Sequence, residues 1–279
     1  MRYKRLILLL AAFATIWIFF RLPHGVTYFV SFDEAQVVDY YTPRDLINFY
    51  QKLSKKKWRI ATRLYKRNLA GKQTRHKKER IPKIIHQIWL EEGPIPKKIQ
   101  IFQETWKKQH PNWEYHLWTK DEIIFFYLQN RPLYDALPST KAKTEILRYE
   151  ILYQFGGLFV DSNFECLKPC DILNENCDFY ASLTDQIRAP ELSSSLIAAT
   201  PRHPVIQRCI RKFREQSPEA FMAKMSSHDL TEHFFHVVKR HSSQINVALP
   251  ATFFYSLPKS AEEIPHFIHT FAIRRLEED

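Results

Sequence analysis

A short stretch near the middle of the chain constrains the fold most, because it joins a helix, a double glycine and a buried strand. Apolar residues recur at helical spacing from Thr144 to Phe155, and Gly156-Gly157 follows at once. The apolar residues 158–160 then indicate a short strand that ends at Asp161. The chain has only five glycines, so two in succession mark a required turn. This order predicts an α/β fold with Asp161 at the carboxyl end of a strand.

That position has a chemical consequence. Ligands of open α/β sheets collect at the carboxyl ends of the strands. In extended backbone, side chains two residues apart lie on the same side, so we expect Asp161 and Asn163 to offer two oxygens to one cation. Mn²⁺ and Mg²⁺ prefer oxygen ligands and commonly bridge a few protein groups to a diphosphate. The alternative without chemistry is an Asp/Asn pair that caps a turn.

Two further strands are expected upstream. Residues 81–89 form a proline-led apolar run that ends at Trp89, and a proline-rich loop follows. Large apolar side chains alternate over residues 111–119, which predicts a second strand. We expect His86 and most of the tryptophans to lie in the core, because aromatic side chains are usually buried in folded domains.

These segments resemble the family 32 glycosyltransferases, which have a DXD-containing sugar-binding region and include fungal Golgi mannosyltransferases. The family pattern runs from an acidic residue through Arg-Tyr, a Gly-Gly turn and an apolar strand to Asp-x-Asp. Glu145, Arg148-Tyr149, Gly156-Gly157 and Asp161 match this pattern. Asn163 stands where the second aspartate is usual, and an amide oxygen binds a cation without adding charge. The resemblance is strongest over residues 81–169.

The resemblance implies a Rossmann-like mixed sheet of the GT-A type, flanked by helices. It implies that Trp89 and Gln87 lie near the nucleotide, that Glu145 accepts hydrogen bonds from the donor, and that Arg148 contacts the donor sugar or phosphates. Arg148 and Asp161 would be the catalytic residues, and Asp161 with Asn163 would hold Mn²⁺ or Mg²⁺. A surface ion pair between Glu145 and Arg148, which lie three apart on a helix, is the simpler interpretation.

The implied reaction is metal-dependent and retaining. It moves a hexose from a GDP- or UDP-sugar to a hydroxyl on a glycan, glycolipid or protein. Three departures leave a second interpretation open, a non-catalytic membrane-tethered protein that binds nucleotide sugars. They are Asn163, the missing Thr-Gly-Pro segment near residues 226–231, and a tail in which His266 or His269 would replace the usual motif.

The charge of the chain is strongly asymmetric. Residues 1–83 hold 19 Lys and Arg against 5 Asp and Glu, whereas the remaining residues hold 22 against 25. A nucleic-acid-binding domain would carry basic residues on its folded part, so we expect no nucleic-acid partner. Two interpretations of the basic segment 52–83 are equally good. It could be a stalk that lies near an anionic surface, or a solvated linker without a partner. A third possibility is an adaptor that binds through this segment alone.

The first residues have the pattern of a membrane anchor. Residues 6–20 are apolar and follow three basic residues, so 1–21 is predicted to be a signal anchor or transmembrane helix. The positive-inside rule then sends the rest to the non-cytoplasmic side. Residues 22–80 would be a basic stem and 81–279 the glycosyltransferase domain. A cleaved signal peptide and a cytoplasm-facing enzyme are the alternatives.

The four cysteines do not have the spacing of a zinc site. In an oxidising compartment Cys166 or Cys170 could pair with Cys177, and buried free thiols are the alternative.

Overall fold

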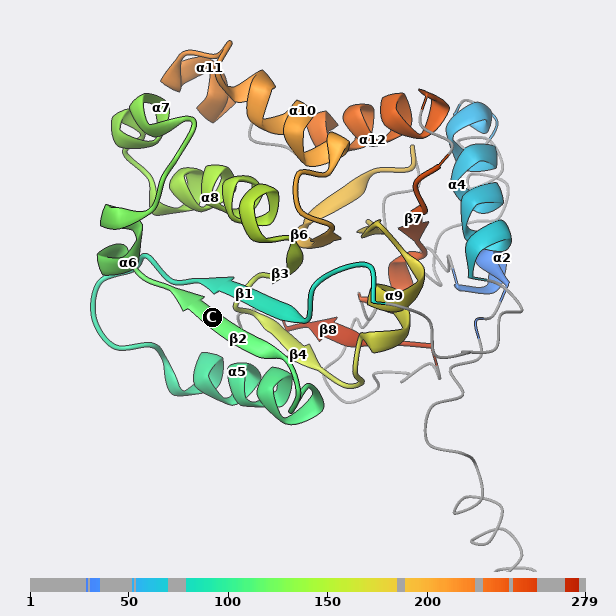
Figure 1. Ribbon diagram of the computed structural model, residues 1–279, viewed down its shortest axis with the longest axis horizontal. Helices are drawn as coiled ribbons and strands as arrows, with labels where there is room; N and C mark the ends of the chain where they lie inside the picture. Colours follow the sequence, from blue (N-terminus) through green and yellow to red (C-terminus); the bar gives the residue numbers. More distant parts are fainter. Residues whose placement is uncertain are drawn as a thin grey trace, which may run out of the picture.

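The fold is built on one mixed sheet of six strands (Figure 1). The computed structural model describes residues 29, 31–35, 52, 54–69, 79–184, 189–223, 228–240, 243–254 and 269–275. The strand order is β2-β1-β3-β6-β5-β7, and a separate two-stranded ribbon pairs β4 with β8. The strands are β1 (Ile84–Ile88), β2 (Glu114–Trp118), β3 (Gly157–Val160), β4 (Phe164–Cys166), β5 (Phe179–Leu183), β6 (Leu192–Ala199), β7 (Asn246–Leu249) and β8 (Ala272–Arg274).

The pairing makes the sheet mixed. β1 runs parallel to both β2 and β3, β6 runs antiparallel to β3 and β5, and β5 runs parallel to β7. The carboxyl ends of β1, β2 and β3 therefore meet at one edge of the sheet. The expectation of a mixed sheet flanked by helices is confirmed.

Helices cover the two faces of this sheet. α8, α10 and α12 form one layer, and α5 packs with the β4–β8 ribbon (Figure 1). The described helices are α2 (Phe32–Ala35), α4 (Lys55–Asn68), α5 (Lys97–Gln109), α6 (Lys120–Phe125), α7 (Arg131–Ala136), α8 (Thr140–Phe155), α9 (Asp171–Asn176), α10 (Pro204–Phe213), α11 (Pro218–Ala223), α12 (His228–Arg240) and the 3₁₀ turn η1 (Ala251–Phe253).

The central helix α8 has a defined start and stop. The hydroxyl of Ser139 accepts a hydrogen bond from the backbone N–H of Ala142, and Gly156 ends the helix at φ 66°. The helix begins at Thr140, four residues before the predicted start, because Ser139 is a preferred N-cap. Its buried residues lie on several sides, since α8 packs between the sheet and α10.

The two glycines after α8 are required by close backbone contacts. Both have positive φ, 66° at Gly156 and 91° at Gly157, which favours glycine. A Cβ on Gly157 would lie 2.6 Å from the carbonyl oxygen of Ile84, and one on Gly156 would lie 2.8 Å from that of Ala199. The double glycine therefore lets the chain turn directly from α8 into β3 between β1 and β6.

His86 holds this turn from the neighbouring strand. Its Nε2 lies 2.9 Å from the carbonyl oxygen of Gly156, and its Nδ1 accepts a hydrogen bond of 3.2 Å from the indole of Trp118. With Nδ1 acting as an acceptor, Nε2 carries the proton and donates to Gly156. Burial lowers the pKa of His86 to about 4, so the ring is neutral at pH 7. The prediction that His86 is a core residue is confirmed.

The second strand differs from its expected pattern. β2 covers Glu114–Trp118, a shorter segment than 111–119, and its burial does not alternate. Glu114 is exposed, the three central residues are half-buried and only Trp118 is buried. The reason is that, among the strands that the structure describes, β2 is the outermost on its side of the sheet and pairs only with β1.

The basic helix α4 packs against the domain, although it lies on the stem side of the predicted boundary. It contacts β7, and its buried aromatic residues meet rings from distant segments. The ring of Tyr65 lies 5.9 Å from that of Phe253 and 5.6 Å from that of Phe32. The boundary at residue 80 stays a prediction, but residues 55–68 share the hydrophobic core.

The predicted anchor, residues 1–21, lies outside the described residues. Within the part of the chain that is described, we find no helix with the length and apolar character needed to cross a bilayer. The anchor and its orientation therefore stay predictions. All four cysteines are buried free thiols, which agrees with that alternative, and burial raises the pKa of Cys166.

Gly157→Ala should be far more damaging than Gly93→Ala. Both glycines have positive φ, so each alanine costs about 1–2 kcal/mol in backbone strain. A Cβ at Gly93 meets nothing within 4 Å, whereas one at Gly157 clashes with backbone and adds about 1–3 kcal/mol. Denaturant unfolding should show the two variants separated by that difference, and equal losses would contradict the assigned role of the turn.

His86 should make the fold sensitive to acid. The folded-state pKa of about 4 lies below the ordinary value of 6.5, so the unfolded chain binds the proton first as the pH falls. The stability that depends on neutral His86 is complete above pH ~6.5 and falls by about 3 kcal/mol toward pH ~4. Denaturant midpoints measured across this range should fall more steeply in the wild type than in His86→Gln. Parallel pH profiles would refute this role.

Candidate active site at the carboxyl end of β3

Asp161 lies at the carboxyl end of β3, as the sequence predicted. Its backbone N–H donates to the carbonyl of Ser195 over 2.8 Å, which continues the pairing of β3 with β6 by one residue. The Asp161 side chain is 28% exposed, so a ligand can reach it. The turn at Gly156-Gly157 and the four-residue strand after it together fix this position.

Arg148 joins Asp161 to Glu145. The Nη2 atom of Arg148 lies 3.6 Å from Oδ1 of Asp161 and 3.3 Å from Oε2 of Glu145. Glu145 and Arg148 lie on one face of α8, as their spacing predicted. Two carboxylates and one guanidinium leave this cluster with a formal charge of −1.

The guanidinium itself is almost enclosed. The Arg148 side chain is only 7% exposed, and its Nη1 donates to the carbonyl of Ser194 over 2.7 Å. Its central carbon lies 4.8 Å from the centre of the Phe159 ring, close enough for a cation–π contact. Because water screens charges less in this enclosed position, the attraction between Arg148 and its two carboxylates is stronger than that of an exposed ion pair. Arg148 therefore places a positive charge close to the Asp161 carboxylate.

Glu145 has a second buried neighbour. Burial raises the pKa of Tyr149 well above its usual range, and the nearby Glu145 carboxylate adds to the increase. Tyr149 therefore stays a neutral hydrogen-bond donor. The Glu145 side chain is 16% exposed, so it is not fully enclosed by the protein. A group with this environment can still accept a hydrogen bond from a ligand hydroxyl.

The expected extended backbone from Asp161 to Asn163 is wrong. Ser162 and Asn163 form a turn, and the N–H of Phe164 approaches the carbonyl of Asp161 at 3.3 Å. The chain must turn here because β4 leaves the main sheet and pairs with β8 instead. The carbonyl of Asn163 also accepts a hydrogen bond of 2.9 Å from the N–H of Arg275. The alternation argument for a shared side therefore does not apply.

Asn163 still fits a cation ligand on other grounds. Its Oδ1 atom is buried and has no hydrogen-bond partner, which is rare for a buried amide oxygen. A hard cation beside the Asp161 carboxylate would satisfy this oxygen. Among the described residues, no cluster of three or more His, Cys, Asp and Glu side chains could hold a metal ion. Asp161 and Asn163 could therefore supply two oxygen ligands, one charged and one neutral.

Gln87 and Trp89 lie on and just after β1. Gln87 is fully buried, accepts a hydrogen bond from the Tyr115 hydroxyl, and reaches the carbonyl of Asp161 with its Nε2 at 3.4 Å. Both contacts support the backbone of the site. The N–H of Trp89 donates to the carbonyl of Trp118, and its half-buried indole has a buried Nε1 without a partner. Their contacts with a nucleotide stay predictions.

The C-terminal segment adds a residue that the sequence pattern did not reveal. Arg275 follows β8, and its guanidinium binds the Glu165 carboxylate at 2.8 Å and 2.5 Å. This ion pair holds the end of β8 beside the turn that contains Asn163. His269 is buried and lies 2.6 Å from the Thr252 hydroxyl, whereas His266 and residues 226–227 lie outside the described residues. Only the pairing of β4 with β8, about 110 residues apart in the chain, brings Arg275 here.

Part of the chain is similar in sequence to known proteins. Residues 96–180 match the family model described as a glycosyltransferase sugar-binding region containing a DXD motif. The chain is 34% identical over 139 residues to inositol phosphoceramide mannosyltransferase 1 of Schizosaccharomyces pombe, covering 47% of this chain and 42% of that protein. It is 30% identical to inositol phosphoceramide mannosyltransferase 3 of the same yeast, covering 47% and 36%.

Several solved structures are also similar, at lower sequence identity. The PaToxG glycosyltransferase aligns with a TM-score of 0.45 and 14% identity, covering 71% of this chain and 81% of that one. The chain spans about two fifths of the length of the two yeast relatives. Residues 96–180 are thus similar to glycosyltransferase sugar-binding regions that contain a DXD motif, and the similarity to family 32 glycosyltransferases expected from the sequence is confirmed.

Proposed function

We propose that this protein is a glycosyltransferase that moves a hexose from a nucleoside-diphosphate sugar to an acceptor hydroxyl. The observation that carries the proposal is the Glu145–Arg148–Asp161 cluster at the carboxyl end of β3, inside the segment that matches the sugar-binding region. A GT-A type of fold is part of the proposal. The names of the yeast relatives favour mannose as the sugar and an inositol phosphate lipid as the acceptor. A glycan or a protein hydroxyl is the alternative acceptor.

The reaction breaks the bond between the anomeric carbon and the diphosphate oxygen, which leaves with the electron pair. A divalent cation, Mn²⁺ or Mg²⁺, would supply the positive charge that stabilises this leaving group. Asp161 and Asn163 would hold it, and Arg148 would fix the direction of the Asp161 carboxylate. The formal charge of −1 on the cluster favours a cation, although the guanidinium at 3.6 Å lowers the attraction.

The remaining residues would position the donor. Glu145 would accept hydrogen bonds from hydroxyls of the donor, and the indole of Trp89 would lie against the base, with its Nε1 available to donate. Gln87 would contribute by supporting Asp161. The new bond forms between the acceptor oxygen and the anomeric carbon, with retention of configuration as the family resemblance implies. A leaving phosphate oxygen would take the acceptor proton.

Asp161→Ala should abolish sugar transfer and donor hydrolysis. The substitution removes the charged ligand of the proposed cation, so the loss should exceed about 100-fold. Asp135→Ala is the matched control, because this carboxylate is exposed on α7 and should leave activity unchanged. Hydrolysis of a panel of GDP- and UDP-hexoses with Mn²⁺ measures both variants. Full activity in Asp161→Ala would refute the assignment.

Asn163→Asp should lower the Mn²⁺ concentration needed for half-maximal donor hydrolysis, by roughly tenfold, because a second carboxylate adds charge to the site. The measurement is a metal titration of initial rates at saturating donor. An unchanged or higher metal requirement would show that residue 163 is not a ligand.

The second candidate is a membrane-tethered nucleotide-sugar-binding protein without catalysis. The observation that favours it is Asn163 in place of the second carboxylate. Calorimetric titration with GDP- and UDP-sugars, with and without Mn²⁺, detects binding in either case. Donor hydrolysis followed in parallel separates them, since a binding protein would give heat of binding and no product.

A further inference from the structure

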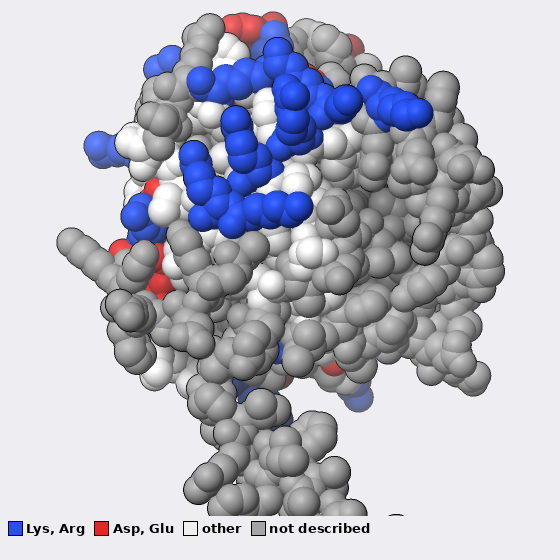
Figure 2. Space-filling view, turned by 90° about the vertical axis from the view of Figure 1, so that its right-hand side faces the viewer, with Lys and Arg blue, Asp and Glu red and all other residues white. Residues whose placement is uncertain are grey.

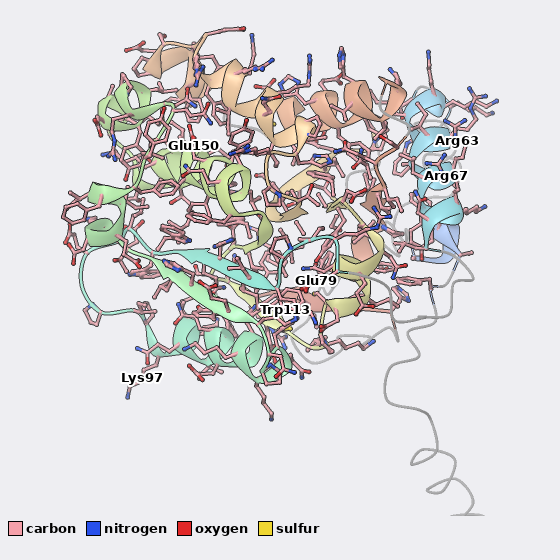
Figure 3. The ribbon with its side chains drawn as sticks, viewed as in Figure 1. Arg63, Arg67, Glu79, Lys97, Trp113 and Glu150 are labelled. Atoms are coloured by element: carbon pink, nitrogen blue, oxygen red, sulfur yellow. The ribbon has the colours of Figure 1, made fainter. Side chains whose placement is uncertain are left out.

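The exposed face of α4 is a surface of positive charge. We define the α4 face as the exposed cations of this helix, which are Lys55, Lys56, Arg59, Arg63, Lys66 and Arg67. Figure 2 shows Lys and Arg gathered on one side of the molecule. Figure 3 places Arg63 and Arg67 on this helix, across the molecule from Lys97.

Three of these cations have no described counter-charge. Arg59, Arg63 and Arg67 recur every four residues along one stripe, and no ion pair links them to any residue that the structure describes. Lys57, by contrast, pairs with Glu232 of α12. Like charges four apart on a helix destabilise it slightly, and cations in the first turn oppose the helix dipole. The first turn of α4 holds lysines and no acidic residue.

The helix is held rigidly in spite of this repulsion. Its opposite face is buried against β7 and the aromatic rings near η1, with Trp58, Leu64 and Tyr65 in the core. The cations are therefore presented in a fixed array about 21 Å long, the length of 14 helical residues. Between them lies a shallow, open hollow lined by Arg59, Thr62, Arg63, Lys66 and Arg67.

The shape and chemistry of the α4 face select one class of partner. A straight, nearly flat row of cations fits a plane of phosphate headgroups. Single-stranded nucleic acid needs aromatic side chains for base stacking, and the aromatic residues of α4, Trp58 and Tyr65, are buried. The face also lacks an exposed large apolar residue, so it would bind by charge without insertion.

We propose that the α4 face docks the domain on a membrane surface that carries anionic phospholipids. The charge distribution agrees, since residues 84–279 hold 22 basic against 25 acidic side chains and so would not compete for such a surface. The apolar residues 6–20 precede α4 in the chain, with residues 21–54 between them, so an anchor would keep this helix close to the bilayer. The face lies by β7, which two strands, β6 and β5, separate from β3 in the sheet, and it is independent of the sugar-transfer proposal.

The test uses the full chain reconstituted into lipid nanodiscs. Thr62→Cys introduces a labelling site in the hollow, and the four native cysteines are buried. A fluorophore at residue 62 is then quenched by lipids that carry a nitroxide on the headgroup. We expect strong quenching in discs with about 30% phosphatidylserine, weak quenching in phosphatidylcholine discs, and loss of the difference in about 0.5 M NaCl.

Three variants separate charge from other effects. Arg59→Gln/Arg63→Gln/Arg67→Gln should lower the ratio of docked to undocked protein about 100-fold, or about fivefold for each cation. The corresponding triple lysine variant keeps the charge and should dock normally. Lys97→Gln/Lys98→Gln/Lys108→Gln removes the same charge from exposed positions of α5 and should also dock normally.

The thermal unfolding midpoint confirms that each variant is folded. Equal quenching in anionic and neutral discs would overturn the proposal, as would an equal loss in the α5 variant. Salt-sensitive binding of single-stranded RNA that depends on Arg59, Arg63 and Arg67, with no preference for anionic discs, would assign the face to nucleic acid instead.

Discussion

The close approach of Gly157 to β1 is the contact on which the site depends. A helix and a buried parallel strand are normally joined by several residues, but here the chain turns within two. That is possible because neither glycine has a Cβ to meet the carbonyl groups of β1 and β6. The neutral ring of His86 then ties the turn to β1 through the carbonyl of Gly156. As a result, α8 and β3 deliver Glu145, Arg148 and Asp161 to one place.

The electrostatics of the site follow from this geometry. Arg148 is too buried to remain uncompensated, and the carboxylates of Glu145 and Asp161 satisfy it from two directions. The guanidinium in turn attracts both carboxylates toward itself. A site built in this way is preorganised, since its charges are held in position before any ligand arrives. The remaining negative charge and the unpartnered amide oxygen of Asn163 are compatible with the cation that we propose for this site.

The two functional surfaces that we propose lie on different parts of the sheet. The candidate active site uses the ends of β1 and β3, whereas the α4 face lies beside β7 (Figure 1). The Arg148 cluster nearly balances its charges inside the protein, and the α4 face leaves its charges exposed. This separation allows the domain to be held at a surface without covering the strand ends where a sugar donor would bind.

Interactions between neighbouring residues made part of the fold predictable from the amino-acid sequence. The order of helix, double glycine and strand predicted Asp161 at a strand end, and helical spacing put Glu145 and Arg148 on one face. The tertiary structure decided the rest, because the causes are distant in the chain. β4 pairs with β8 and not with the main sheet, so residues 161–163 form a turn. The hydroxyl of Tyr115 on β2 donates to Gln87, whose amide nitrogen approaches the carbonyl of Asp161. α4 packs into the core through the contact of Tyr65 with Phe253, although the composition of this helix indicated only a stem. Local patterns carry no information on such partners, since each contact joins segments that only the folded chain brings together.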